Sequence, residues 1–223
     1  KDRPVENLSI RLNNLSKITD VDALMTDGSV TKGGAVTLGV NAGTETAATW
    51  TTLANRTTGT VTLSGTAAID DSTGANMLTF VNLTNIAGIG SLNATITSTP
   101  NATGTTAYAN LNTIDAAIGT LTVTATGFAL EATKAQITTM YGAITFAAQS
   151  INATLTDASG LTYADIGDGA GGLLHSTNQT NGIKSVTIKS QTAFTADTAA
   201  NCKSLADLGV ANASTGKIVF KAN

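Results

Sequence analysis

The sequence has few charged residues, few aromatic residues and a single cysteine. Charged residues make up 12% of its 223 positions, aromatic residues 4%, and the formal net charge at pH 7 is −3. A surface so poor in positive charge, with a pI near 5.0, argues against nucleic-acid binding. Because Cys202 has no partner cysteine, the chain forms no internal disulfide. We expect this residue to be small, apolar and buried, with a reactive thiol as the alternative.

Long apolar runs and prolines are also scarce. No stretch approaches the roughly 18 apolar residues that a membrane-spanning helix needs, so we expect no membrane span. The first residues, KDRPVENLS, lack the apolar region of a signal peptide. The chain contains only two prolines, and its hydrophobic content of 42% with low net charge is not typical of disorder. A folded protein is therefore expected.

Small residues dominate what is present. Threonine and alanine together account for about a third of the chain, and there are 22 glycines. Side chains of this size favour a thin core in which backbones approach closely, as between stacked coils. A net charge near zero does little to keep molecules apart, which favours packing against copies of the same chain.

Charge divides the chain into two expected parts. Residues 1–32 carry 10 of the 27 charged side chains, and no Lys or Arg lies between Arg56 and Lys134. We interpret residues 1–32 as either a cap on the first coil or an arm that docks on a neighbouring subunit. Residues 33–223 are expected to form a repeat-built, β-rich body.

A short phrase with strand-like alternation recurs through this body. Apolar residues occupy the third and fifth positions of GAVTL (34–38), GTVTL (59–63), GTLTV (119–123) and GAITF (142–146). Weaker versions are GSLNA (90–94), KSVTI (184–188) and GKIVF (216–220), and SLNATIT (91–97) nearly repeats as SINATLT (150–156). Between them, residues 46–59, 128–142 and 195–209 have helix-forming composition and end in Gly. The predicted fold is all-β or mainly β, a repeat-built β-solenoid with short helical turns between strands. A β-sandwich is the alternative.

The stretch GTLTVTATGFALEATKAQITTMYGAITF resembles repeats of large bacterial surface-layer-like and haemolysin-type adhesins. The likeness covers roughly residues 34–220 and lies in composition and rhythm. Similar Thr/Ala/Gly-rich repeats occur in phage fibres and archaeal surface filaments. The resemblance implies an extracellular structural or adhesive role, and it transfers no functional residues.

One Gly-rich loop is a candidate metal site. In DIGDGAGG (165–172), Asp165 and Asp168 are spaced among glycines, as acidic ligands are in calcium-binding β-rolls. The alternative is a solvated turn, which we also expect for Asp70–Asp71. Calcium is the only cofactor that the sequence suggests.

Asn-x-Ser/Thr sequons are about twice as frequent as chance predicts. They are acceptor candidates for N-glycosylation. The alternative is that Asn, Ser and Thr are the polar residues of strand exteriors. The candidates are Asn55, Asn82, Asn93, Asn101, Asn152, Asn178 and Asn212, with Asn7 and Asn14 in the N-terminal segment.

Catalytic residues are hard to find. His175 is the only histidine and precedes Ser176, but no G-x-S-x-G elbow accompanies them. We therefore expect a non-enzymatic, extracellular or cell-surface protein that assembles with its own copies into a surface layer, fibre or adhesin stalk. The alternative is a carbohydrate-binding or virion-fibre module, located on a virion surface in the latter case. Trp50 and Tyr163 would then lie on an exposed face and bind surface glycans.

Overall fold

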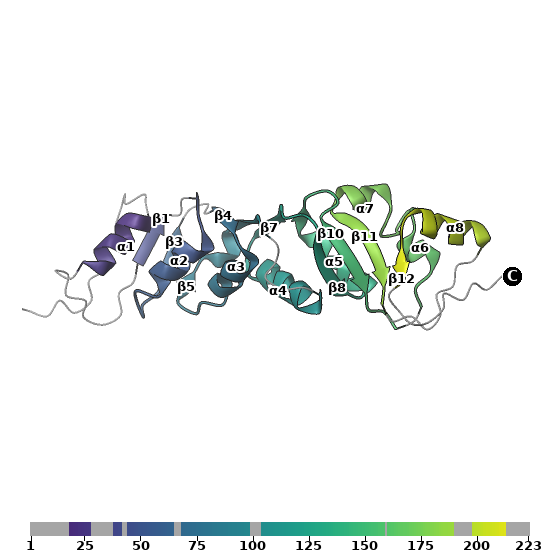
Figure 1. Cartoon of the computed structure of the whole chain (residues 1–223). Helices are drawn as coiled ribbons and strands as arrows, with labels where there is room; N and C mark the ends of the chain where they lie inside the picture. Colours follow the sequence, from purple (N-terminus) through teal and green to yellow (C-terminus); the bar gives the residue numbers. More distant parts are fainter. Residues whose placement is uncertain are drawn as a thin grey trace, which may run out of the picture. The chain divides into compact units, whose positions relative to one another are not determined.

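The computed structural model describes residues 18–27, 38–41, 44–64, 68–98, 104–158, 160–189 and 198–212. The chain divides into two compact units, Lys1–Ser98 with Thr113–Thr122, and Thr99–Asn112 with Val123–Asn223. Both units combine helices with parallel strands (Figure 1). The fold class is therefore mixed α/β, and the prediction of an all-β or mainly β protein is wrong, whether as a β-solenoid or as a β-sandwich.

The first unit has two sets of parallel strands. One sheet has the order β1-β3-β5, and in another β2, β4, β6 and β7 are neighbours in that order. The strands are β1 (Leu38–Asn41), β2 (Thr44–Glu45), β3 (Val61–Ser64), β4 (Ala68–Ser72), β5 (Ile86–Ala87), β6 (Asn93–Ile96) and β7 (Thr120–Val123). The helices are α1 (Ile18–Thr26), α2 (Ala47–Ala54), α3 (Gly74–Val81) and the short 3₁₀ helix η1 (Ile89–Ser91). Helix α4 (Gly104–Ala117) has residues in both units.

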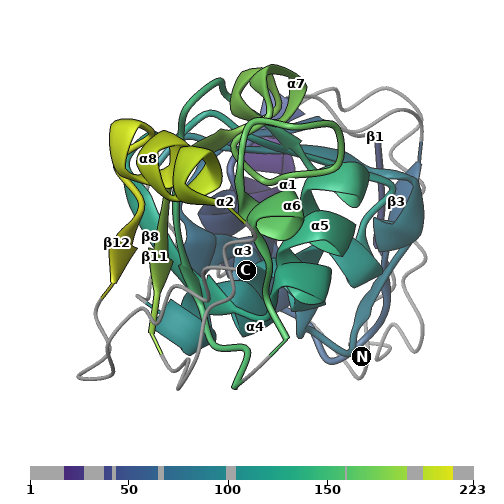
Figure 2. The same cartoon turned by 90° about the vertical axis from the view of Figure 1, so that its right-hand side faces the viewer.

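The second unit has one parallel sheet of order β12-β11-β10-β8. Its strands are β8 (Phe128–Ala132), β10 (Ile151–Leu155), β11 (Ile183–Ile188) and β12 (Ala211–Asn212), with β9 (Thr145–Phe146) preceding β10. Its helices are α5 (Lys134–Ala143), α6 (Tyr163–Ile166), α7 (Ser176–Thr180) and α8 (Ala199–Asp207). Figure 2 shows α6 and α8 close to one another, and the hydroxyl groups of Tyr163 and Ser204 lie 3.2 Å apart between them.

A shared capping pattern starts four of the helices. A threonine in extended conformation caps α2, α3, α5 and α8, and each accepts a hydrogen bond from the backbone N–H three positions later. Apolar residues follow four and seven positions after the cap, so that they lie on one face of the helix. The caps are Thr46, Thr73, Thr133 and Thr198, and the residues on that face are Trp50 and Leu53, Met77 and Phe80, Ile137 and Met140, and Cys202 and Leu205.

These helices explain why the sheets are parallel. Leu38 pairs with Val61 and Phe128 pairs with Ile151, each 23 positions later. To pair two successive strands in parallel, the chain must return to the end of the sheet at which the first strand began. This crossover takes a dozen or more residues, commonly in a helix. Here α2 lies between β1 and β3, and α5 lies between β8 and β10.

Several predicted strands are confirmed. Residues 59–63 contain the start of β3, 119–123 contain β7, 184–188 lie in β11, and 150–156 contain β10. Of 90–94 only Asn93 and Ala94 lie in β6, and of 142–146 only Thr145 and Phe146 are strand. Most of 34–38 and all of 216–220 lie outside the described residues.

The remaining structural predictions met different outcomes. The helices expected in 46–59 and 195–209 are confirmed as α2 and α8. The helix expected over 128–142 is correct only from Lys134, because 128–132 form β8 with Phe128, Leu130 and Ala132 buried in alternation. Asp70 and Asp71, expected in a turn, lie in β4. Of the predicted N-terminal segment 1–32, residues 18–27 are described and include α1.

Candidate functional site

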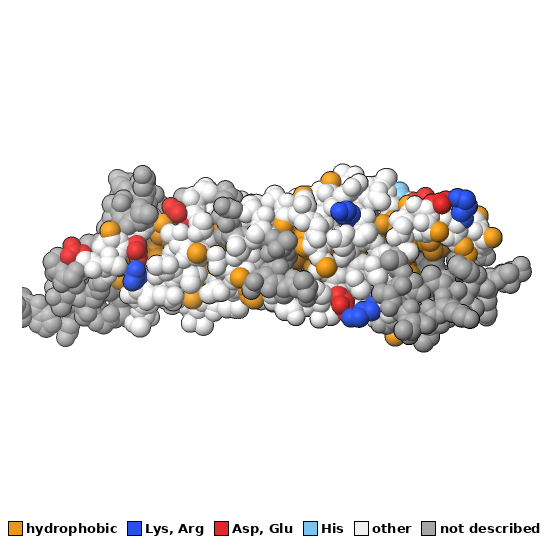
Figure 3. All heavy atoms as spheres, viewed as in Figure 1, with side chains coloured by type: hydrophobic (Ala, Val, Ile, Leu, Met, Phe, Trp, Pro, Cys, Tyr) orange, Lys and Arg blue, Asp and Glu red, His pale blue; other side chains and the backbone are white. Residues whose placement is uncertain are grey.

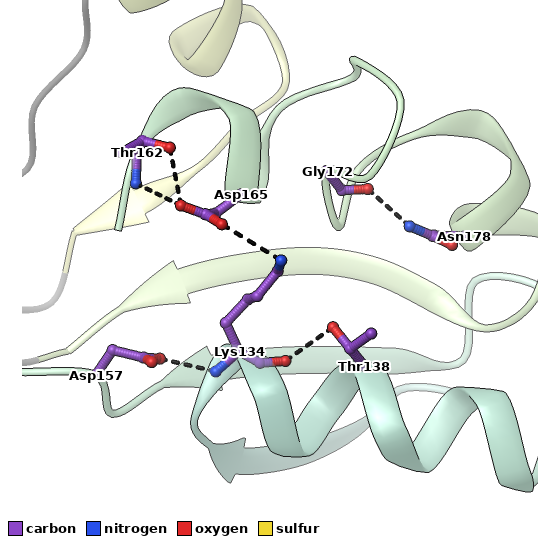
Figure 4. Close-up of polar contacts among 7 residues, drawn as sticks. All are labelled: Lys134, Thr138, Asp157, Thr162, Asp165, Gly172 and Asn178. Carbon is purple, nitrogen blue, oxygen red and sulfur yellow. Dashed lines mark hydrogen bonds and ion pairs between the residues drawn. The ribbon is translucent and has the colours of Figure 1, made fainter. Parts of the chain in front are cut away.

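A group of polar contacts in the second unit surrounds Lys134, the first residue of α5 (Figure 4). Thr133 and Gln136 form a capping box, in which the Gln136 side chain accepts the Thr133 N–H at 2.9 Å. Asp157 Oδ2 accepts the Lys134 backbone N–H at 2.8 Å. A carboxylate here faces the positive end of the helix dipole, which favours its charge.

The register of the sheet brings Asp157 to this position. Strands β8 and β10 run parallel with Ala132 opposite Leu155. Two positions further along both strands, Lys134 and Asp157 therefore lie side by side. The contact thus follows from strand pairing and not from proximity in sequence.

Asp165 connects the same lysine to α6. Its Oδ2 accepts the Thr162 N–H at 2.9 Å and the Thr162 hydroxyl at 2.8 Å, and its Oδ1 lies 3.3 Å from Lys134 Nζ. Burial alone would raise the pKa of Asp165, but the Thr162 hydrogen bonds and the Lys134 ammonium outweigh it and hold that pKa below its ordinary value. Asp165 is therefore held as an anion that ties α5 to α6.

Asp168, the other predicted calcium ligand, has a different partner. Its Oδ1 accepts a hydrogen bond from the Tyr163 hydroxyl, and its side chain is exposed. Both oxygens of Asp165 already contact donors, one of them a cation. This arrangement does not favour Ca²⁺ at Asp165 and Asp168, and no group of three or more acidic, His or Cys side chains in the described ranges is placed to hold a metal.

The sequons differ in what surrounds them. Asn55 and Asn82 are exposed and follow α2 and α3 as C-caps, and Asn93 is exposed on β6. Asn152 and Asn178 are half-buried, and their side-chain amides donate to Gly127 O and Gly172 O, respectively. Asn101, Asn7 and Asn14 lie outside the described residues, and for Asn212 only the backbone in β12 is described.

The other residues considered from the sequence serve the fold. His175 caps α7, with its Nδ1 accepting the Thr177 N–H at 3.4 Å, and Ser176 begins that helix. This use of Nδ1 does not fit a nucleophile–base pair with Ser176. Cys202 is half-buried on α8. Trp50 is completely buried on α2, so it does not lie on a glycan-binding face.

One surface hollow of about 380 Å³ lies on the first unit between α1 and α2. It is lined by Asp22, Ala23, Ala48, Thr49 and Thr52, and Asp22 accepts a hydrogen bond from Arg56 at 3.0 Å. With small side chains and one paired carboxylate, it offers little to position a ligand. In the same unit, burial raises the pKa of Asp115 on α4.

Sequence reasoning missed Lys134 and Asp157. The Thr-x-x-Gln spacing of Thr133 and Gln136 was a usable signal for the start of a helix. Asp157 carries no local signal, because its partner lies 23 positions away.

Comparison of the chain with protein-family models, with curated proteins and with solved structures gave no match. In the described part of the chain, no helix has both the length and the apolar character required to cross a bilayer.

Proposed function

We propose that this protein is an extracellular structural protein whose copies assemble into a surface layer, fibre or adhesin stalk. The observation that carries the proposal is how the fold uses its charges. Arg56 pairs with Asp22, Lys134 with Asp165, Lys189 with Glu131 and Lys203 with Asp207, each pair within one unit. Each of these four cations is therefore compensated by a carboxylate of its own unit.

What remains on the surface is mostly neutral. On the face drawn in Figure 3, acidic and basic side chains occupy few places among the described residues. Hydroxyl and amide groups take their place, for example on Thr62, Thr120 and Asn93, which are exposed on strands. A neutral surface lets copies approach without charge repulsion, and net charge near zero promotes association.

The polar groups inside the units also serve structure. Hydroxyl groups of Thr51 and Thr138 bond back to the carbonyls of Ala47 and Lys134 one helical turn earlier. With the threonine caps, these bonds use hydroxyl groups to hold helices in place. The alternative of a carbohydrate-binding module loses one of its aromatic residues, because Trp50 is buried.

Sedimentation velocity over a wide concentration range, together with electron microscopy, tests the proposal. We expect the assembled fraction to rise with concentration and to change little between 0.05 and 0.5 M salt, where screening weakens contacts between charges. A single monomeric species at all concentrations would overturn self-assembly. Assembly that dissolves at high salt would overturn the neutral contact surface.

A further inference from the structure

Two of the sequons have the same acceptor triplet in almost the same local sequence. Asn93 lies in SLNATIT on β6, and Asn152 lies in SINATLT on β10. Both asparagines are on the side of the strand that faces away from the core, because their neighbours in sequence are buried. The two side chains nevertheless differ, because Asn93 is exposed and Asn152 is half-buried.

Both polar atoms of the Asn152 side-chain amide form hydrogen bonds. Ser185 Oγ donates to its Oδ1 at 2.8 Å, and its Nδ2 donates to Gly127 O at 3.2 Å. Ser185 stands directly opposite Asn152 in the register of β10 and β11. Asn178 is similarly engaged, with its Nδ2 donating to Gly172 O at 2.7 Å.

Asn93 differs in exposure. Its side chain is exposed, and in the register of β4 and β6 it stands opposite Ala68, as Asn152 stands opposite Ala129 of β8. Asn55 and Asn82 are exposed too, and each is the C-cap nine positions after the threonine that starts its helix. Each is followed two positions later by a threonine, Thr57 and Thr84.

We propose that Asn55, Asn82 and Asn93 are acceptors for an N-linked sugar, whereas Asn152 and Asn178 are not acceptors in the folded chain. The donor is a sugar activated through a diphosphate. The Asn Nδ2 attacks the anomeric carbon, a C–N bond forms, the C–O bond to the diphosphate breaks, and the amide proton passes to a base. The step needs Nδ2 to reach the donor, which the hydrogen bonds of Asn152 and Asn178 oppose. This proposal is independent of self-assembly.

The near-identical pair supplies the control for the experiment. The full chain, produced without sugar, is incubated with a soluble transferase that moves glucose from UDP-glucose to Asn-x-Ser/Thr, and each site is followed by peptide mass spectrometry. We expect Asn93 to be modified at least tenfold faster than Asn152 in the folded chain. Synthetic peptides SLNATIT and SINATLT should differ by less than twofold. Asn93→Gln removes the signal at that site.

Equal rates at Asn93 and Asn152 in the folded chain would overturn the proposal. So would an unmodified Asn93 in the folded chain when its peptide is modified. The protein isolated from its own source gives the second test: we expect added sugar mass on peptides containing Asn55, Asn82 and Asn93. A native mass equal to the sequence mass would overturn the proposal, whatever the rates with the added transferase.

Discussion

Strands β6 and β10 offer a comparison of two regions with nearly one sequence. In SLNATIT the residues Leu92, Ala94 and Ile96 are buried, and in SINATLT the residues Ile151, Ala153 and Leu155 are buried. The alternation is the same in both, and the exchanges between Leu and Ile fall only on buried positions. Local sequence was therefore sufficient to orient both strands.

The polar faces of the two strands differ because of what pairs with them. Ser185 on β11 donates to Asn152, which is half-buried, whereas Asn93 is exposed. On the preceding strand each asparagine stands opposite an alanine, Ala129 for Asn152 and Ala68 for Asn93. The residues that follow the two strands differ as well. After β10, Asp157 accepts the first N–H of α5, whereas after β6 the Ser98 hydroxyl is buried with no hydrogen-bond partner. The comparison teaches that alternation is a property of the segment and that polar contacts are a property of its neighbours.

The largest expected effect tests what the two strands share. Ile96→Ala and Leu155→Ala should each lower the free energy of unfolding by about 2–5 kcal/mol, because both side chains are completely buried. The exchanges Ile96→Leu and Leu155→Ile should each cost less than about 1.5 kcal/mol, since volume is kept. Urea denaturation followed by circular dichroism measures both. A loss below about 1 kcal/mol for only one of the two truncations would contradict the equivalence of the two buried faces.

The next effect concerns the polar ties of the β10 region. Asp165→Ala should lower the free energy of unfolding at pH 7 by about 0.5–2 kcal/mol, as loss of a helix cap does. Because the pKa of Asp165 is lowered in the folded state, its contribution is present above the pKa of the unfolded chain and is lost as pH falls through the folded pKa.

Thermal denaturation between pH 2 and 7 checks this prediction, and Asp165→Ala should have the flatter acid limb. Asp207→Ala is the control, since its pair with Lys203 is an exposed one on a single helix. If both variants had the same acid limb as the unchanged chain, the tie through Asp165 would not stabilise the fold.

An effect of similar size separates the two asparagines. Asn152→Ala removes two hydrogen bonds and leaves the Ser185 hydroxyl without its acceptor, so we expect a loss of about 1–2 kcal/mol. Asn93→Ala should change the free energy of unfolding by less than about 0.5 kcal/mol, as exposed substitutions usually do. The two variants are compared by urea denaturation. Equal losses would mean that Ser185 and Gly127 do not distinguish the strands.

The smallest effect concerns the residue that follows β6. Ser98→Ala removes a buried hydroxyl that has no partner, so the variant should be as stable as the unchanged chain or more stable by up to about 1 kcal/mol. Asp157→Ala, two positions after β10, should instead destabilise α5 by about 0.5–1 kcal/mol. Thermal denaturation of the two variants compares them. A stabilised Asp157→Ala would contradict its role at the helix.

Some of the fold and little of the candidate site could be predicted from the sequence. Period-2 alternation located β3, β7, β10 and β11, since burial of one face is a local pattern. Strand β8 was not located, because the composition of Phe128–Ala132 also suits a helix and the segment was expected to be helical. Nothing local distinguished Asp165, which meets Lys134 across 31 positions, from Asp168, three positions further along.

By itself, the sequence determined which segments alternate, where threonine caps can start helices, and how little charge the surface can carry. These follow from residue type and spacing. Tertiary structure alone decided that the strands pair in parallel. The intervening segments fold as helices that carry the chain back to the end of the sheet at which the preceding strand began. Tertiary structure also decided that Asn152 is held, because β11 places Ser185 opposite it and Gly127 O accepts its amide. Asn93, in nearly the same local sequence, is exposed.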